Sequence, residues 1–267
     1  MSACVFPFPI VTASAADARS RLWLRRFGER LTDLEIDLRH DDGRDAATAV
    51  LTSCCLDGNG DAADVETLRD LPLADRLAAL LTLAAHVDDR ELETTLRCHS
   101  CGEQLEAPLP AHEIIDYAAT RTAPAGHVRV ELPERVLLLR LPTARDLARW
   151  SESGASAEQM VNSLCSEPAQ LPPTLPRQWL ELIERALGEA DPLVDFRLAI
   201  DCPECDAHAS YDIDLQALAL RRLAKARREL LATVHRLASV YHWSEGDIMA
   251  LPPSRRRQYL ALIEAER

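Results

Sequence analysis

The residues best suited to chemistry are two widely separated Cys-x-x-Cys pairs. Cys98 and Cys101 form the first pair, and Cys202 and Cys205 form the second. Two such turns supply four thiolates, which is the ligand set of a tetrahedral structural zinc site. Backbone amides in tight turns also donate hydrogen bonds to the sulfurs of such sites. We therefore predict that these four cysteines bind one structural zinc ion.

Three other uses of the cysteines stay open at this point. A redox dithiol normally lies at the start of a helix after a strand, whereas both pairs here precede further alternating segments. Two unrelated pairs of buried thiols would need no metal. A rubredoxin-like iron site uses the same four sulfurs, and the spacing alone does not distinguish iron from zinc.

Each pair is flanked by segments with the alternation of β-strands. Segments 91–97 and 103–109 flank the first pair, and segments 194–200 and 207–213 flank the second. This shared layout indicates a weak internal repeat, in which two β-hairpins meet and each contributes half of a metal site. Zinc ribbons usually keep their halves about 15–20 residues apart, so we read the chain as one ribbon with a long insertion.

The other cysteines and the nearby histidines are not expected to bind the metal, because four cysteines complete its shell. Cys54 and Cys55 are adjacent and cannot chelate one ion as a Cys-x-x-Cys pair does, so we predict buried, inert side chains. The same role is predicted for Cys4 and Cys165. The histidines near the pairs that offer alternative ligands are His99, His112 and His208.

The periodicity of the chain predicts an α+β fold. Apolar residues at helical spacing predict a helix within 13–31, and alternation at 34–38 predicts a half-exposed strand. Thr143 and Asp146 form the capping box of a helix in the insertion. The predicted organisation is a mainly helical N-terminal region (1–90), a zinc-ribbon-like pair of β-hairpins within 91–213 (hairpins 91–110 and 193–213), an inserted strand and helix segment (127–190), and a C-terminal helical tail (214–267).

Length and composition are those of a soluble globular protein. The chain has 267 residues, of which 47% are hydrophobic and 27% charged, enough for one large or two modest domains. Its longest apolar run, near 77–87, is too short to span a bilayer, and its start has no signal-peptide pattern. We expect a cytoplasmic protein, which agrees with thiols kept for a metal rather than for disulfides.

The charge is unevenly distributed along the chain. The formal net charge is −13, yet residues 219–267 contain ten Arg or Lys and five acids, so the tail is about +5 and the remainder about −18. An acidic body argues against general nucleic-acid binding, while the basic tail is compatible with a local anionic partner.

The start of the last predicted helix breaks a local preference. Arg255, Arg256 and Arg257 lie in its first turn, where the helix dipole disfavours cations. Violations of this kind are often functional, and Arg and aromatic residues are enriched at interface hot spots. We therefore predict a partner-binding element formed by these arginines with Trp243 and Tyr259. The alternative is that the triplet pairs with the acidic body of its own chain.

Four stretches in this order resemble the T-even-phage-like base plate (hub assembly) protein family, found in gene clusters for contractile phage tails and phage-tail-like injection systems. The resemblance covers about residues 71–263, and the first cysteine pair departs from it by having His99-Ser100 in place of a proline-containing turn. The stretches are Leu71-Pro72-Leu73-Ala74-Asp75-Arg76, Leu141-Pro142-Thr143-Ala144-Arg145-Asp146-Leu147, Cys202-Pro203-Glu204-Cys205, and a tail with Val234-His235-Arg236-Leu237-Ala238, Tyr241-His242-Trp243-Ser244-Glu245, Ile248-Met249-Ala250-Leu251-Pro252 and Arg255-Arg256-Arg257-Gln258-Tyr259-Leu260.

The resemblance implies a structural or assembly role in a baseplate, not catalysis. Its partners would be other baseplate, hub or spike proteins, with no small-molecule substrate, nucleic acid or membrane, and the chain would stay cytoplasmic or join an assembled tail-like particle. The sequence contains no nucleotide-binding loop, hydrolase elbow or zincin motif. Two other classes remain open: a zinc-ribbon nucleic-acid-binding or transcription regulatory protein, and a thiol redox enzyme.

Overall fold

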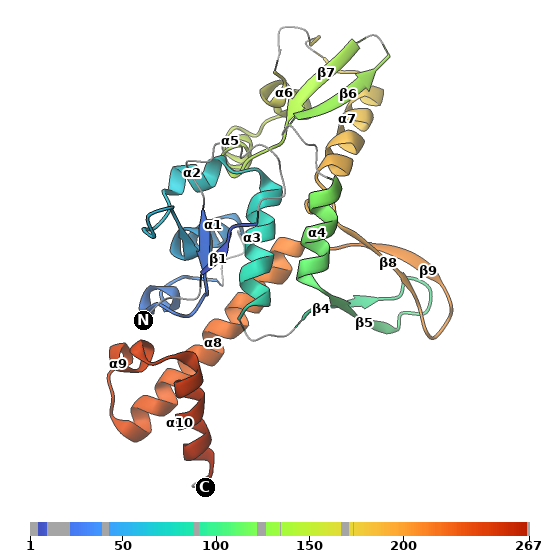
Figure 1. The fold of residues 1–267 in the computed structure, drawn as a ribbon. Coiled ribbons are helices and arrows are strands. Elements are labelled where there is room, and N and C mark those ends of the chain that lie inside the picture. Colours follow the sequence, from blue (N-terminus) through green and yellow to red (C-terminus); the bar gives the residue numbers. More distant parts are fainter. Residues whose placement is uncertain are drawn as a thin grey trace.

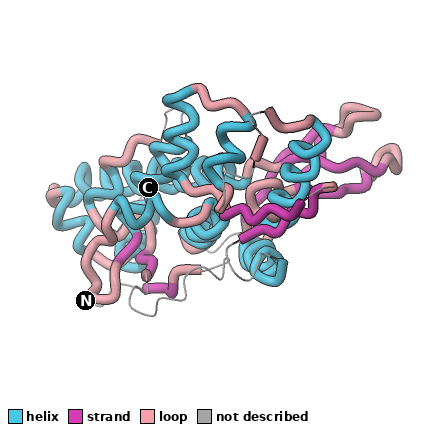
Figure 2. The backbone as a smooth tube through the Cα atoms, turned by 90° about the horizontal axis from the view of Figure 1, so that it is seen from above, coloured by secondary structure: helices cyan, strands magenta, loops and turns pink. Residues whose placement is uncertain are grey.

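The computed structural model describes residues 5–9, 22–38, 43–87, 91–121, 127–133, 135–166, 171–172 and 174–265. Helices and small antiparallel sheets alternate along this part of the chain, so the fold is α+β as expected (Figure 1). The long helix α8 (Leu215–Tyr241) runs from the region of the cysteine hairpins to the C-terminal helices. The longer strands of the described chain lie toward the same side of the molecule in the view of Figure 2, in three separate two-stranded sheets.

The N-terminal region contains a small antiparallel sheet in the order β1-β2-β3. A 3-10 helix and an α-helix lie between the second and third strands. The elements in chain order are β1 (Val5–Pro7), β2 (Trp23–Arg25), η1 (Leu31–Leu34), α1 (Gly43–Cys54) and β3 (Cys55–Leu56). The helix predicted within 13–31 is therefore wrong where the structure describes the chain, and its part at 13–21 lies outside the described residues. The strand predicted at 34–38 is also wrong.

A buried ion pair explains why this region departs from the sequence pattern. The guanidinium of Arg25 donates two hydrogen bonds to the carboxylate of Asp33, at 2.7 and 2.6 Å, and both side chains are at most 1% exposed. The backbone amide of Gly28 and the hydroxyl of Ser53 also donate to Asp33. Burial alone would raise the pKa of Asp33, but these hydrogen bonds hold it below its usual value. The turn at η1 closes around this pair.

Two helices separated by a Leu-Pro link complete the main core. These are α2 (Val65–Asp70), which Asp64 caps by accepting a hydrogen bond from the amide of Thr67, and α3 (Leu73–Ala85). The break between the two helices lies at Leu71 and Pro72. The apolar face of α3 packs against α1 and the first half of α8. Residues of both cysteine hairpins are buried in the same core, so the hairpins pack against these helices.

The cysteine hairpins belong to a repeat in which each position recurs 104 residues later, as Cys98 does at Cys202. In the first copy, hairpin β4 (Leu92–Arg97) and β5 (Gln104–Leu109) leads into α4 (Ala111–Arg121). In the second copy, β8 (Arg197–Asp201) and β9 (His208–Asp212) leads into α8. The helices before the hairpins, α3 and α7 (Arg177–Ala190), also correspond. The weak repeat seen in the sequence is thus a repeat of helix, hairpin and helix.

The segment between the two copies has a core of its own. The segment consists of the hairpin β6 (His127–Leu132) and β7 (Arg135–Arg140) and the helices α5 (Ala144–Ser153) and α6 (Ala157–Leu164), and its core also includes α7 of the second copy. Thr143 caps α5, and Asp146 completes the predicted capping box. The Asp146 carboxylate also receives two hydrogen bonds from Arg140, at 2.5 and 2.8 Å, which tie the helix to the hairpin.

The last two helices pack against the end of α8 and form a third small core. They are α9 (Glu245–Ala250), capped by Ser244, and α10 (Pro253–Ala265). α8 ends at His242, whose backbone is left-handed (φ 56°). Among the described residues, none of the helices is long and apolar enough to cross a membrane.

Candidate metal centre

The two cysteine turns have the same backbone geometry. The amide of Cys98 donates to the carbonyl of Glu103 (2.8 Å), and the amide of Gly102 donates back to the carbonyl of Cys98 (3.0 Å). In the second turn, the amide of Cys202 donates to Ala207 (3.0 Å) and that of Asp206 donates to Cys202 (2.9 Å).

The fifth position of each turn is left-handed, with φ 77° at Gly102 and φ 55° at Asp206. Glycine adopts this conformation freely, and aspartate tolerates it better than most residues. Each hairpin therefore ends in a tight turn that aims its two cysteines in one direction.

The four thiols lie together although they come from opposite halves of the repeat. The Sγ atoms of Cys98 and Cys205 are 3.7 Å apart, those of Cys101 and Cys202 are 3.6 Å apart, and all four lie within 4.8 Å of one another. A tetrahedral site with bonds of about 2.3 Å requires sulfur–sulfur distances of about 3.8 Å. The cluster therefore has the dimensions of a four-coordinate metal site.

The cluster has a buried side and an exposed side. Cys98 and Cys202, the first residues of the two pairs, are buried in the main core, whereas Cys101 and Cys205 are exposed. The ligands of the buried side are thus fixed by packing.

Hydrogen bonds give the thiols of Cys98 and Cys205 different pKa values. The backbone amides of Cys101 and Ser100 lower the pKa of the Cys98 thiol to about 6, and the amide of Ser100 lies 3.4 Å from its sulfur. The amide of Ala207 acts in the same direction on Cys205, but hydrogen bonding with the other thiols, Cys101 above all, together with burial outweighs it and raises the pKa of Cys205 to about 12. Four thiols this close do not all ionise without a cation, and a bound divalent ion would supply the missing charge.

The alternative ligands lie outside the cluster. The ring of His99 contacts the ring of Tyr211 in a tilted arrangement, with the centroids 4.6 Å apart, and Nδ1 of His208 lies 2.7 Å from the carboxylate of Asp201. His112 is exposed on α4, near Glu113. In the described part of the chain, the only group of metal-binding side chains is the set of four cysteines.

The other cysteines behave largely as predicted. Cys54 and Cys55 are fully buried, and burial is the main cause that raises the pKa of the Cys55 thiol to about 12, so these thiols are inert. Cys165 is half-buried instead of buried, and Cys4 lies outside the described residues.

The predicted partner-binding residues occupy two environments. Arg255 and Arg257 are exposed, but Arg256 is 4% exposed and points into the protein, where it contacts Met249 Sδ (3.0 Å) and the Gly28 carbonyl (3.5 Å). The arginine triplet is therefore not one surface. Trp243 and Tyr259 are half-buried in a cluster with Tyr241, with ring centroids 4.8 to 5.4 Å apart.

One buried carboxyl group, that of Asp191, was not predicted from the sequence. Asp191 follows α7 and is 3% exposed. Its Oδ1 accepts a hydrogen bond from the backbone amide of Val194 (3.3 Å), and its Oδ2 has no hydrogen-bond partner among the described residues. Ala74, in the first turn of α3, is close enough for its amide to act on the pKa of Asp191. Burial raises the pKa of Asp191 to about 6, and the nearby charge of Asp75 acts in the same direction. A lone acid at the end of an amphipathic helix is normally solvated, so nothing in its spacing indicates this position.

The chain was also compared with protein-family models, curated proteins and solved structures, and no match was found.

Proposed function

We propose that this protein is a structural or assembly component of the baseplate of a contractile phage tail or phage-tail-like injection system, stabilised by one structural zinc ion. The observation that supports a structural metal best is the closed set of four thiols at tetrahedral distances. Zinc bound by Cys98, Cys101, Cys202 and Cys205 has no open coordination position for water or substrate. Such a site fits a protein that holds other proteins rather than one that catalyses a reaction.

The metal preference follows from the ligands. Four thiolates bind zinc or iron, and both accept a tetrahedral arrangement. Zinc has no redox chemistry and is the usual occupant of closed thiolate sites in proteins. We therefore assign zinc, and with it the architecture of a split zinc ribbon whose two hairpins, β4–β5 and β8–β9, come from the two copies of the repeat.

The baseplate role rests on the order of the sequence stretches that resemble that protein family. The contact surface that we propose is the C-terminal arm, which is α9 and α10 with the end of α8 (residues 234–265). Arg255 and Arg257 are exposed on α10, the helix that also carries the half-buried ring of Tyr259, which packs on Trp243. Arginine and aromatic residues are enriched at interface hot spots, and a guanidinium holds a carboxylate through two hydrogen bonds. An acidic surface on a neighbouring baseplate protein is the expected partner.

Deletion of the gene tests this role directly. If the protein is needed for baseplate assembly, the deletion strain should make few or no complete sheathed particles by electron microscopy, and the wild-type gene should restore them. The double variant Arg255→Ala/Arg257→Ala should fold normally but restore particles poorly. Normal numbers of complete particles in the deletion strain would reject the proposal.

Exposed cations along α8 are the feature that favours the alternative function, nucleic-acid binding. Arg221, Lys225 and Arg228 are all exposed. Tight binding of duplex DNA that weakens steeply with salt would favour a regulatory zinc-ribbon protein over a baseplate component.

A further inference from the structure

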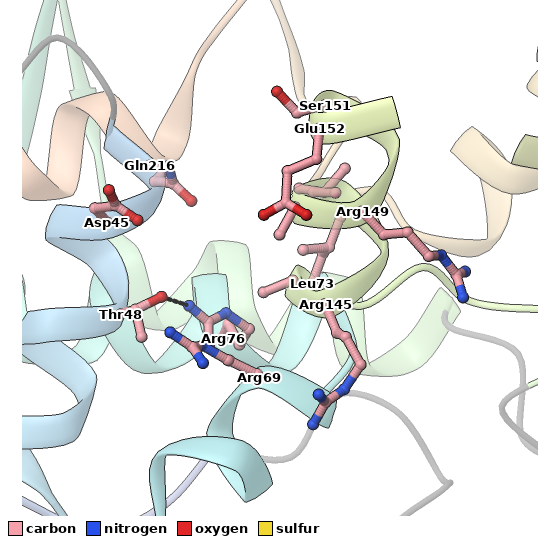
Figure 3. A pocket seen from close by; sticks show the side chains of 13 residues that line it. Asp45, Thr48, Arg69, Leu73, Arg76, Arg145, Arg149, Ser151, Glu152 and Gln216 are labelled. Carbon is pink, nitrogen blue, oxygen red and sulfur yellow. Dashed lines mark hydrogen bonds between the residues drawn. The ribbon is translucent and has the colours of Figure 1, made fainter. Parts of the chain in front are cut away.

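A cavity of about 500 Å³ lies between α1, the α2–α3 unit and α5, and none of the cysteine ligands lines it (Figure 3). Asp45 and Thr48 line it from α1, Arg69 and Arg76 from α2 and α3, and Glu152 from α5. A cavity of this size can hold an amino-acid side chain with part of its backbone. Its walls come from segments far apart in the sequence, so it is a feature of the folded protein.

The guanidinium of Arg76 borders this cavity without a carboxylate partner in the described part of the chain. It is 5% exposed, and it donates to the backbone carbonyl of Leu68 (2.6 Å) and the hydroxyl of Thr48 (2.8 Å). Both acceptors are neutral. A buried charge is costly unless an opposite charge lies close to it, and a guanidinium has five N–H donors. Arg76 is therefore suited to a further, anionic acceptor.

Two other arginines of this protein are each paired with a carboxylate. Arg25 holds the carboxylate of Asp33 through two hydrogen bonds, and Arg140 holds that of Asp146 in the same way. Both carboxylates are buried, at no more than 4% exposure. By comparison with these pairs, the carboxylate is the component that Arg76 lacks.

A second guanidinium adds to the positive charge at this end of the cavity. Arg69 lines the same cavity, with its side chain half-exposed and Nη1 2.7 Å from Glu66. Burial lowers the pKa of Arg76 to about 10, and the like charge of Arg69 acts in the same direction. A carboxylate placed between the two would offset the burial of one and the repulsion between both.

The opposite wall limits what kind of anion fits. In Figure 3 the side chains of Glu152, Asp45 and Gln216 lie across the cavity from Arg69 and Arg76. Two carboxylates repel a free multivalent anion such as phosphate, but they accept hydrogen bonds from N–H groups. A peptide with an acidic side chain satisfies both walls, because its carboxylate faces the arginines and its backbone amides face the acids.

We propose that this cavity binds an aspartate or glutamate side chain presented by a partner polypeptide, with Arg76 and Arg69 as the carboxylate-binding residues. This site does not depend on the baseplate assignment, because the cavity is distinct from the metal centre and from the C-terminal arm. The deletion experiment and the binding experiment below can therefore fail separately.

Capped amino acids test the proposal on the full-length protein. N-acetyl-L-glutamate N-methylamide should cause saturable NMR shifts of amides around the cavity, and the corresponding glutamine compound should bind roughly 10-fold more weakly, because a charge-assisted hydrogen bond is lost. Inorganic phosphate is the third probe. Equal binding of the glutamine compound, or saturable binding of phosphate without binding of the glutamate compound, would overturn the proposal.

Variants identify the residues responsible. Arg69→Ala should weaken binding of the glutamate compound roughly 10-fold, since it removes one charged donor. The matched control is Arg149→Ala, because Arg149 also lines the cavity but pairs with Asp146 (2.8 Å) and extends away from it in Figure 3. Arg76→Met should abolish binding; if that variant does not fold, Arg69→Ala remains decisive. Unchanged binding by Arg69→Ala, or an equal loss with Arg149→Ala, contradicts the assignment.

Discussion

Removing one exposed ligand should separate the effect of the metal from the effect of packing. Cys101 and Cys205 are exposed, so changing either to serine removes little buried apolar surface. Cys165→Ser is the matched control, since that half-buried thiol lies outside the cluster. We expect one zinc ion per chain in the wild type and in Cys165→Ser, and substoichiometric zinc in Cys101→Ser and Cys205→Ser.

The stability change follows from linkage between binding and folding. A ligand that is present at about 1,000 times its dissociation constant and binds only the folded state stabilises it by roughly 4 kcal/mol. For a chain of this size, each kcal/mol shifts Tm by roughly 2–4 °C, so loss of zinc should lower Tm by roughly 8–16 °C. The hairpins should respond most, because an isolated two-stranded hairpin is at best marginally stable.

Elemental analysis and thermal unfolding, with and without a chelator, measure these quantities, and hydrogen exchange locates the change. Faster exchange in 92–109 and 197–212 with little change in α3 would agree with a metal that holds the two hairpins. The reasoning is refuted if the wild type is metal-free and stably folded with four titratable thiols, or if Cys101→Ser keeps both its zinc and its Tm.

The remaining predictions concern charged residues. Arg256→Ala should lower the free energy of unfolding by on the order of 2 kcal/mol in urea titrations, because a buried side chain is lost, whereas Arg255→Ala and Arg257→Ala should each change it by less than about 0.5 kcal/mol. Equal effects at all three positions would contradict the observed burial of Arg256. For Asp191, the folded pKa of about 6 exceeds the ordinary 3.8, so its contribution to stability is present below pH 3.8 and is lost as the pH rises through 6. The stability of Asp191→Asn relative to the wild type should therefore rise by about 2 kcal/mol between pH 4 and pH 7; a pH-independent difference would show that Asp191 titrates normally.

Local signals predicted much of the fold. The hairpins of the two cysteine pairs, the capping box of Thr143 and the helical tail from Asp214 all depend on residues close together in the sequence, and all are found. Period-2 alternation beside a tight turn and a cap before an apolar run have few competing interpretations. The clustering of the cysteines was also predictable, since four equivalent ligands in two equivalent turns suit one ion.

The errors arose where a distant partner decided the structure. Leu22, Trp23 and Leu24 are compatible with a helix or a strand, and pairing of β2 with β1 and β3 selects the strand. Asp33 directly precedes the alternating residues 34–38, and nothing in this pattern indicates that it is fully buried against Arg25. Arg256 is likewise indistinguishable in sequence from its two exposed neighbours. Ion pairs and burial of this kind are set by tertiary packing, which no local pattern encodes.

The repeat explains why a metal is useful at this position. The two turns are separated by about 100 residues, and a covalent link that closes a loop of about 100 residues disfavours the unfolded chain by roughly 4–5 kcal/mol in the chain-entropy model. A metal bound by both turns is a link of the same kind. A metal bound by the four cysteines would join the two copies at their hairpin ends, and Asp191 of the second copy lies close to Ala74 at the start of α3 in the first. Because α8 follows closely after the second hairpin, a metal that fixes this hairpin would also fix the base of the helix against whose far end Trp243 and Tyr259 pack. Loss of the metal should therefore impair partner binding even though no ligand lies in the C-terminal arm.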